Sequence, residues 1–454
     1  MSREVLLSAT QSVCPECLQR IEAARLTRGD EVILRKECPE HGRFQAVIWR
    51  GLPAFEAWQR PKTPARPRFP KAGSEAGCPR DCGLCGEHRQ HTCTALIEVT
   101  SRCDLRCAYC FADGGYGRRP DPGLDDLRKS FELLLRAGGP YNIQLSGGEP
   151  TLRGDLPEIV GLGRALGFEF IQVNTNGLRL ARDPNYAKVL KEAGVASVFL
   201  QFDGLDEAPY RKLRGRPLLK DKVLAVEHCA RHGLAVVLVP TLVPGVNDRQ
   251  IGEIINFGLI NSPVIRGVHF QPVSYFGRFP TAPGEAKRLT IPEILREIQA
   301  QTGGRIKVEH FKPPGCENSW CSFHGNFVLL KEGELVAWTR HSPCCTPESA
   351  AAGAIKTSRF VSQFWAQPSR DEIGADAGGS GPSLGGWDII LERARTHAFC
   401  ISGMAFQDAW NLDLERLKDC CIHVVHPDGR LIPFCAYNLT DSHGRGLYRS
   451  QIEA

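Results

Sequence analysis

Three of the 19 cysteines in this 454-residue chain have a spacing that suits an iron–sulfur cluster. They are Cys103, Cys107 and Cys110, in the segment Cys103-Asp-Leu-Arg-Cys107-Ala-Tyr-Cys110, so three thiolates share one short loop. Three thiolates can hold three irons of a [4Fe–4S] cube and leave the fourth iron without a protein ligand. A metal needs such an open coordination position to bind and activate a substrate. The triplet alone also fits a zinc knuckle.

Short polar and glycine-rich segments follow the next three strand-like runs of the chain. They are Ser146-Gly-Gly-Glu-Pro150, Asn174-Thr-Asn-Gly177 and Gln201-Phe-Asp-Gly204. Glycines let a ligand approach the backbone closely, and Glu149 can accept hydrogen bonds from an ammonium group. The other side chains suit hydroxyls and carboxylates. Each segment alone is weak evidence for a site, but their order on consecutive strands strengthens the prediction.

A parallel α/β sheet is the element that must position these segments. Apolar strand-like runs alternate with helical patterns from Ala95 onward, which predicts right-handed crossovers in a partial barrel or a doubly wound sheet. Such sheets carry their chemistry at the carboxyl ends of the strands. The predicted strands are Ala95–Thr100, Asn142–Leu145, Phe170–Asn174, Ser197–Phe202, Ala235–Val239 and Gly267–Val273.

The CxxxCxxC loop followed by GGEP on the next strand resembles the radical S-adenosylmethionine (SAM) superfamily, over roughly residues 95–305. The resemblance implies an α/β fold, a (β/α)6 partial TIM barrel, in which Cys103, Cys107 and Cys110 hold the cluster. It implies that Gly147, Gly148 and Glu149 hold the amino end of SAM and that Tyr109 lies by the adenine. Weaker candidates for the ribose and carboxylate of SAM are Asn174, Asn176, Gln201 and Asp203. In this family the reduced cluster cleaves SAM, and the resulting 5′-deoxyadenosyl radical abstracts a hydrogen atom.

A second cysteine group lies directly before the first predicted core strand. It consists of Cys78, Cys82, Cys85 and Cys93 on a Gly/Pro-rich loop. Four cysteines have the number and compactness for a fully ligated auxiliary [4Fe–4S] cluster. A structural zinc is the alternative.

A third group lies near the N-terminus, with Cys14 and Cys17 in a CPEC segment and Cys38 and His41 in CPEHG. A CxxC pair with a distant cysteine and a nearby histidine is typical of a small ribbon with one tetrahedral metal. Spacing alone favours zinc. The fourth ligand stays open, because His41 can instead be a turn residue while another cysteine completes the site.

Nine cysteines remain, and eight of them follow residue 315. Cys229 lies in a helical pattern and is most simply a buried, inert thiol. Eight cysteines in one segment favour one further [4Fe–4S] cluster, so that two auxiliary clusters are expected. The candidate ligands are Cys316, Cys321, Cys345, Cys420, Cys421 and Cys435.

The cysteine pattern of nearly the whole chain resembles one multi-cluster branch of the superfamily. CPEC…CPEHG, GCPxxCGLC…QHTC and the terminal CCIHVVHPDGRLIPFCAYN carry this resemblance. The branch includes archaeal tetraether lipid synthases, proteins once classed as radical SAM methyltransferases, and the TrsS group linked to selenium metabolism. Tetraether synthases imply three [4Fe–4S] clusters and a rubredoxin-like iron, which favours iron at the N-terminal site. The length and C-terminus look most like TrsS, although no selenocysteine is present.

Composition sets further limits. The net charge is +5, and residues 1–71 hold 13 Lys/Arg against 8 Asp/Glu. The segment Arg60–Lys71 is typical of a Pro-rich linker. The net positive charge is too small to predict nucleic-acid binding. The odd number of cysteines argues against a disulfide scaffold. Without a signal-peptide pattern or a bilayer-length apolar run, we expect a cytoplasmic protein that is not integral to a membrane.

We expect four regions along the chain. Residues 1–71 form a rubredoxin-like or zinc-ribbon-like metal domain with the linker, and residues 72–94 form an auxiliary [4Fe–4S] loop. Residues 95–305 form the radical SAM barrel, and residues 306–454 form a C-terminal auxiliary-cluster domain. A Gly/Ser-rich loop at Ala375–Gly386 interrupts the last region.

The expected function is a radical SAM enzyme that abstracts hydrogen from an unactivated carbon. The expected outcome is C–C or C–S/Se bond formation on a lipid-like or a sulfur- or selenium-containing small molecule. A reducing partner such as ferredoxin or flavodoxin is implied. One alternative is a peptide-modifying radical SAM maturase, whose usual winged helix is not evident before the core. The other is a non-catalytic iron–sulfur electron carrier, which would need neither GGEP nor an open cluster.

Overall fold

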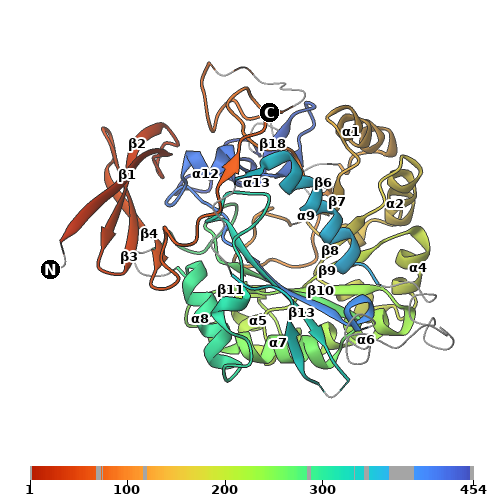
Figure 1. Cartoon of the computed structure of the whole chain (residues 1–454). Coiled ribbons are helices and arrows are strands. Elements are labelled where there is room, and N and C mark those ends of the chain that lie inside the picture. The colour runs from red at the N-terminus through yellow and green to blue at the C-terminus, as the bar shows by residue number, and fades with distance from the viewer. Residues whose placement is uncertain are drawn as a thin grey trace.

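The chain folds around one large mixed sheet, with a small antiparallel sheet to one side (Figure 1). The computed structural model describes residues 3–67, 73, 75–115, 120–283, 288–331, 333–341, 347–367 and 393–449. No helix within these ranges is both long and apolar enough to cross a membrane.

The six predicted core strands are present, and they pair in parallel in the order β6-β7-β8-β9-β10-β12. The partial barrel is confirmed. All five residues of β10 are buried, as expected for a parallel strand whose two faces are both covered. The bounds are β6 Thr94–Thr100, β7 Asn142–Gly147, β8 Ile171–Thr175, β9 Ser197–Gln201, β10 Ala235–Val239 and β12 Ile265–Pro272, with the short β11 Thr241–Leu242 pairing beside β12.

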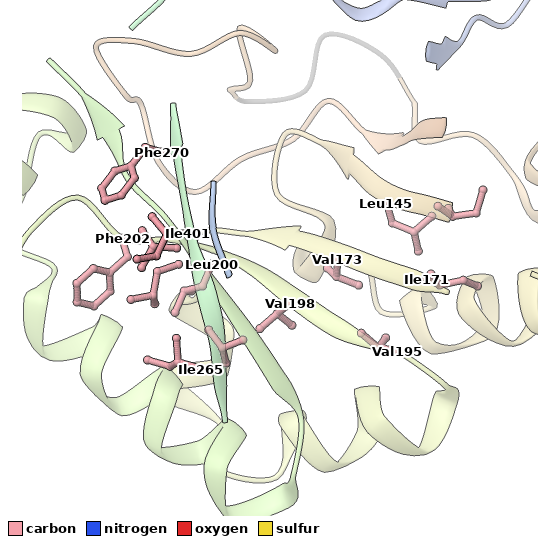
Figure 2. Packing of buried hydrophobic residues seen from close by; sticks show 14 of the residues in the cluster. Leu145, Ile171, Val173, Val195, Val198, Leu200, Phe202, Ile265, Phe270 and Ile401 are labelled. Carbon is pink, nitrogen blue, oxygen red and sulfur yellow. The ribbon is translucent and has the colours of Figure 1, made fainter. Parts of the chain in front are cut away.

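Helices between these strands cover the outer face of the barrel (Figure 1). The sequence has five apolar residues at helical spacing, which predict one buried helix face, and all five lie on α1: Leu124, Leu127, Phe131, Leu134 and Leu135. Leu127, Phe131 and Leu134 are buried and Leu135 is partly buried, whereas Leu124 at the helix start is 38% exposed. Figure 2 shows branched and aromatic side chains of the strands packed towards these helices. The helices are α1 Leu124–Arg136, α2 Leu156–Ala165, α3 Leu178–Arg182, α4 Tyr186–Ala193, α5 Glu207–Arg214, α6 Leu219–His232, α7 Ile251–Ile260 and α8 Ile291–Gln301, with short 3-10 turns at Pro150–Leu152, Asp248–Gln250 and Val308–His310.

The C-terminal residues extend the barrel sheet at both edges. β16 (Ala398–Met404) pairs in parallel with β12, and β17 (Ile422–Val425) pairs in parallel with β6. The sequence HVVHPDGRLIPF predicts a hairpin, which is confirmed as β17 paired antiparallel with β18 (Leu431–Pro433). The strand β16 was not predicted, and the boundary at residue 306 stays a prediction. The remaining elements are β13 Ser322–Leu329, β14 Leu335–Ala337, β18 Leu431–Pro433, α12 Leu414–Lys418, α13 Phe434–Tyr437 and α9 Ala350–Phe364, with β15 Glu348–Ser349 paired to β5 Lys62–Thr63. The Gly/Ser-rich loop lies outside the described residues.

The N-terminal sheet is a four-stranded antiparallel ribbon in the order β1-β2-β3-β4. The short β-like runs Glu31–Arg35 and Gln45–Trp49 in the sequence predict parts of β3 and β4 only. It missed β1 and β2 because several of their inward positions hold polar residues, such as Arg25, which is buried through an ion pair with Asp413 at 2.6 Å. Lys36 joins the ribbon to the rest of the chain through Ala409 O at 2.5 Å. The bounds are β1 Glu4–Val13, β2 Arg20–Arg28, β3 Glu31–Cys38 and β4 Gly42–Arg50.

Candidate active site

The CxxxCxxC loop leaves the carboxyl end of β6 and lines a cavity of about 560 Å³ inside the barrel. Two neighbouring segments hold the loop in place. Ala108 N donates to Leu213 O at 2.9 Å, and Cys110 N donates to Arg278 O at 2.9 Å. Gly277 permits the second contact, because its φ is +64° and a Cβ there would collide with the carbonyls of Cys110 and Phe111.

The geometry of the three thiols fits a cluster better than one ion. Cys103, Cys107 and Cys110 all line the cavity and are partly exposed to it. Among the described side chains, two other groups have all of their ligand atoms within 4.8 Å of one another. In the CxxxCxxC loop at least one pair of sulfur atoms is farther apart than that. A wider spacing is expected when each sulfur binds a different iron. Burial raises the pKa of the Cys103 thiol to about 12, so its thiolate form depends on a bound metal.

The GGEP segment turns directly against this loop. A Cβ at Gly148 would collide with the main-chain carbonyl of Arg102, so glycine is required there for the two loops to pack. Glu149 is buried at 2% exposure and accepts hydrogen bonds from Thr151 N, Thr175 Oγ1 and Asn176 N at 3.1, 2.8 and 2.6 Å. Its carboxylate therefore joins the ends of β7 and β8. Burial raises the pKa of Glu149 despite these bonds.

The weaker SAM candidates divide into two sets. Asn174, Asn176 and Gln201 line the cavity, as does Tyr109. Asp203 does not line the cavity. Its carboxylate is fully buried and accepts hydrogen bonds from Nε and Nη2 of Arg214 at 2.7 and 2.8 Å. The contact of Asp203 with SAM stays a prediction; the residue that lines the cavity at this point is Arg214.

Replacing Asp203 with alanine is expected to destabilise the fold by about 3–5 kcal/mol. Arg214 would then be left buried without its charged partner. Urea denaturation followed by circular dichroism measures the change. Asp126→Ala is the control, since it breaks an exposed pair with Lys129 and should cost less than about 1 kcal/mol. Equal effects of the two substitutions would contradict the buried ion pair.

The far wall of the cavity holds residues that sequence reasoning missed. Phe199 and Trp365 stack with ring centroids 5.7 Å apart, and His269 lies beside both. His269 Nδ1 is 2.9 Å from Ser402 Oγ, and burial lowers the pKa of His269 to about 4, so the ring is neutral. Alternating polar residues inside otherwise apolar strands were the available signal. Trp365 gave none, because it follows α9 and enters the barrel through tertiary packing.

The N-terminal group closes as one compact metal site. The ligand atoms of Cys14, Cys17, Cys38 and His41 lie within 4.8 Å of one another, and Cys38 Sγ is 3.5 Å from His41 Nδ1. The cysteines stand at the turns between β1 and β2 and between β3 and β4. The set has the thiolate and imidazole donors of a tetrahedral ribbon site, and it supports His41 as the fourth ligand.

Cys93 does not join the other three cysteines of its loop. Cys78 interacts through its thiol with Cys82 and Cys85, which fits an auxiliary cluster on that loop. Cys93 instead lies with Cys316 and Cys421, all three within 4.8 Å. The predicted four-cysteine group is corrected on this point. Cys93 lies beside Cys421, the residue directly before β17, and not with the other cysteines of its own loop.

The other C-terminal cysteines form a looser set. Cys321, Cys420 and Cys435 are close enough for the charge of one thiolate to raise the pKa of another. Cys321 Sγ also accepts a hydrogen bond from Arg416 Nη2 at 3.4 Å. This set fits the expected C-terminal cluster. Cys345 lies outside the described residues, and Cys229 is fully buried in α6 as expected.

Comparisons with known proteins agree with this geometry. Residues 97–258 match the radical SAM superfamily model, and residues 6–50 match the HMPTM N-terminal zinc ribbon domain, which favours zinc over iron in the ribbon. The chain is 34% identical to a 7,8-dihydro-6-hydroxymethylpterin dimethyltransferase of Methanocaldococcus jannaschii, over 98% of this chain and 94% of that protein. It is 35% identical to a probable GTP 3′,8-cyclase of Archaeoglobus fulgidus, over 36% and 53% of the two chains.

Among solved structures, Streptococcus suis SuiB bound to precursor peptide SuiA matches 40% of each chain at 17% identity, with a TM-score of 0.36. The superfamily brings a [4Fe–4S] cluster and SAM, and the further cysteine groups and the ribbon fit auxiliary clusters and zinc. The open cysteine loop, the partial barrel and the full-length relative together show that this chain is an enzyme of the radical SAM superfamily.

Proposed function

We propose that this enzyme transfers methyl groups to a reduced pterin or a closely similar planar nitrogen heterocycle. The relative that matches 98% of the chain is named for such a reaction. The observation that carries the proposal is the wall of the barrel cavity, which combines stacked aromatic rings with two amide oxygens that have no hydrogen-bond partner among the described residues.

Aromatic side chains offer a flat surface to a planar ring. Phe199 and Trp365 are nearly parallel, with an interplanar angle of 24°, and both line the cavity. Phe170 lines it as well. Offset stacking of aromatic rings contributes about 0.5–1.5 kcal/mol beyond the burial of area. A bicyclic heterocycle has the shape to use this surface.

The cavity wall also offers hydrogen-bond acceptors, the oxygens of two amide side chains. Asn174 Oδ1 and Asn326 Oδ1 are buried, and neither has a hydrogen-bond partner in the described part of the chain. An unsatisfied buried acceptor costs about 1–3 kcal/mol, which a ligand carrying N–H groups removes. An alkyl chain would leave both oxygens unsatisfied. These two buried acceptors therefore favour a heterocycle over the lipid-like substrate expected from the sequence.

The residues of the chain have separate tasks in this proposal. Cys103, Cys107 and Cys110 would hold the cluster, and the GGEP turn with Asn176 would hold SAM. Together these two cofactors would supply a 5′-deoxyadenosyl radical that removes a hydrogen atom from carbon. A second SAM would donate the methyl group to that carbon and, after taking up one further electron, would leave as S-adenosylhomocysteine. The barrel wall orients the heterocycle, and the buried cavity excludes water from the reactive species. A low-potential donor such as ferredoxin or flavodoxin would supply the electron.

The test is an anaerobic incubation of reconstituted enzyme with SAM, a strong reductant and 7,8-dihydro-6-hydroxymethylpterin. We expect mass spectrometry to detect the pterin with one and then two added methyl groups. A peptide library and a long-chain lipid serve as competing substrates for the maturase and lipid alternatives. Modification of either of these, with the pterin unchanged, would overturn the proposal.

Asn326→Leu should weaken binding of the pterin about 5- to 150-fold and leave SAM cleavage in place. The substitution removes one acceptor of the cavity wall, on β13, which lies across the sheet from the cluster loop. A loss of 1–3 kcal/mol corresponds to this range. Binding is measured by titration of pterin fluorescence. Asn261→Leu, beyond the end of α7 and outside the cavity wall, is the control and should bind as the wild type does.

A further inference from the structure

The thiols of Cys93, Cys316 and Cys421 meet at the opposite end of β6 from the cluster loop. Cys93 directly precedes β6 and Cys421 directly precedes β17, and these two strands are parallel neighbours with Thr94 opposite Ile422. Cys93 N donates to Cys421 O at 2.9 Å, so the strand register places the two cysteines side by side. Their sulfur atoms are 3.2 Å apart.

Cys316 reaches the same point from a third segment of the chain. Its carbonyl accepts hydrogen bonds from Gln90 Nε2 and, at 3.2 Å, from Lys62 Nζ, which hold that segment against the loop before β6. All three sulfur atoms lie within 4.8 Å of one another, and the three residues are at most 4% exposed. Three buried thiols brought together from distant parts of the sequence need a common partner to explain their convergence.

We propose that Cys93, Cys316 and Cys421 hold a single metal ion, zinc or iron, at the floor of the substrate cavity. Thiolates about 2.3 Å from one tetrahedral ion lie a little under about 4 Å apart. This separation falls between the 3.2 Å of the Cys93–Cys421 pair and the 4.8 Å within which all three sulfur atoms lie. The same compact spacing occurs in the N-terminal ribbon, whereas the cluster loop is wider. This inference goes beyond the proposed function and does not rest on the identity of the heterocycle.

No fourth ligand joins this group among the residues that the structure describes, and the fourth coordination position would face the cavity. Cys93, Cys421 and Glu317 all line the cavity, together with the cysteines of the CxxxCxxC loop. Because β6 has seven residues, the two centres stand about 20 Å apart along the strand, with the cavity between them. An ion with three protein ligands and an open position can bind a heteroatom of a substrate.

Glu317 is placed to assist that open position. Its Oε2 is 3.6 Å from Cys421 Sγ, and Ser322 Oγ donates to its other oxygen. The carboxylate is buried at 8% exposure. It can accept the proton of a ligand that binds the ion, or orient that ligand by a hydrogen bond. Lys62, which also donates to Glu317 O, offsets part of the negative charge that three thiolates bring.

Metal analysis of anaerobically purified protein tests the proposal. Zinc, iron and inorganic sulfide per chain are measured for the wild type, Cys316→Ser and Cys400→Ser. Cys400 is a matched control, because it is a buried cysteine of β16 that lines the same cavity outside this group. We expect Cys316→Ser to lose one metal ion per chain and no sulfide, and Cys400→Ser to lose nothing. Retention of every ion in Cys316→Ser would overturn the proposal, and so would loss of several irons together with sulfide.

A second measurement does not depend on how well Cys316→Ser folds. Cys17→Ser removes a ligand of the ribbon site and leaves the cavity group intact. X-ray absorption at the edge of the remaining single ion should then show three sulfur neighbours at about 2.3 Å and one lighter neighbour. The absence of any zinc or non-cluster iron from Cys17→Ser would contradict the cavity site. Both readouts are independent of turnover.

Discussion

Replacing Cys107 with alanine is expected to abolish SAM cleavage and to leave the other metal sites occupied. Cys107 lies at the centre of the loop that lines the cavity, and the nearby positive charge of Arg214 acts to lower the pKa of its thiol, against the larger effect of burial. Two thiolates cannot hold three irons of a cube, so the protein should lose about four irons and four sulfides per chain. The measurement is 5′-deoxyadenosine formed under a strong reductant, together with iron and sulfide content.

Cys229→Ala is the control for this experiment. Cys229 is as buried as any cysteine that the structure describes but packs in α6 among apolar side chains. Its removal should leave SAM cleavage at the wild-type level. If deoxyadenosine still formed in Cys107→Ala, the active site would have to lie at another cysteine group.

The second large effect is expected for Glu149→Gln. The carboxylate accepts hydrogen bonds from two main-chain N–H groups and two hydroxyls, and a neutral amide cannot reproduce that acceptor-only pattern. In the proposed site the same group would hold the ammonium of SAM. Charged hydrogen bonds contribute about 1.5–3 kcal/mol each, so the affinity for SAM should fall roughly 10- to 150-fold.

Equilibrium binding of SAM to the cluster-loaded protein measures this effect. Thermal unfolding of the same samples shows whether the joined ends of β7 and β8 also loosen. Glu158→Gln on the exposed face of α2 is the matched control and should leave both quantities unchanged. An unaltered affinity for SAM in Glu149→Gln would show that the carboxylate only supports the fold.

The barrel and its loop could be predicted from the sequence because their signals are local. Continuous apolar runs such as Ala235–Val239 are typical of parallel strands, and the cysteine spacing in CxxxCxxC fixes three ligands on one turn. The ribbon site is equally local, since Cys14 with Cys17 and Cys38 with His41 are each close pairs in sequence. For these features the chemistry follows from residues that are neighbours in the chain.

The grouping of the remaining cysteines could not be predicted, because it depends on which distant strands become neighbours. Cys93 meets Cys421 only because β17 joins the edge of the sheet beside β6, and no local pattern specifies that pairing. Cys316 likewise arrives through contacts with Gln90 and Lys62. From its position in the sequence, Cys93 was predicted to belong to its own loop. Tertiary packing places it with Cys316 and Cys421 instead.

Asp203 shows the same limit at the SAM site. Its position after β9 correctly predicted a polar side chain at the active end of the barrel. The sequence did not show that this carboxylate would form an ion pair with Arg214, eleven residues later at the end of α5. Which of two polar neighbours faces a cavity depends on side-chain packing rather than on periodicity.

The most direct test of the account measures 5′-deoxyadenosine formed from SAM by the wild-type, cluster-loaded enzyme under reductant, with and without 7,8-dihydro-6-hydroxymethylpterin. We predict that deoxyadenosine forms in both samples and that the pterin increases its rate, because the substrate completes the barrel cavity around the reactive centre. No deoxyadenosine from a folded sample with full iron content, or a rate indifferent to the pterin, would contradict the account.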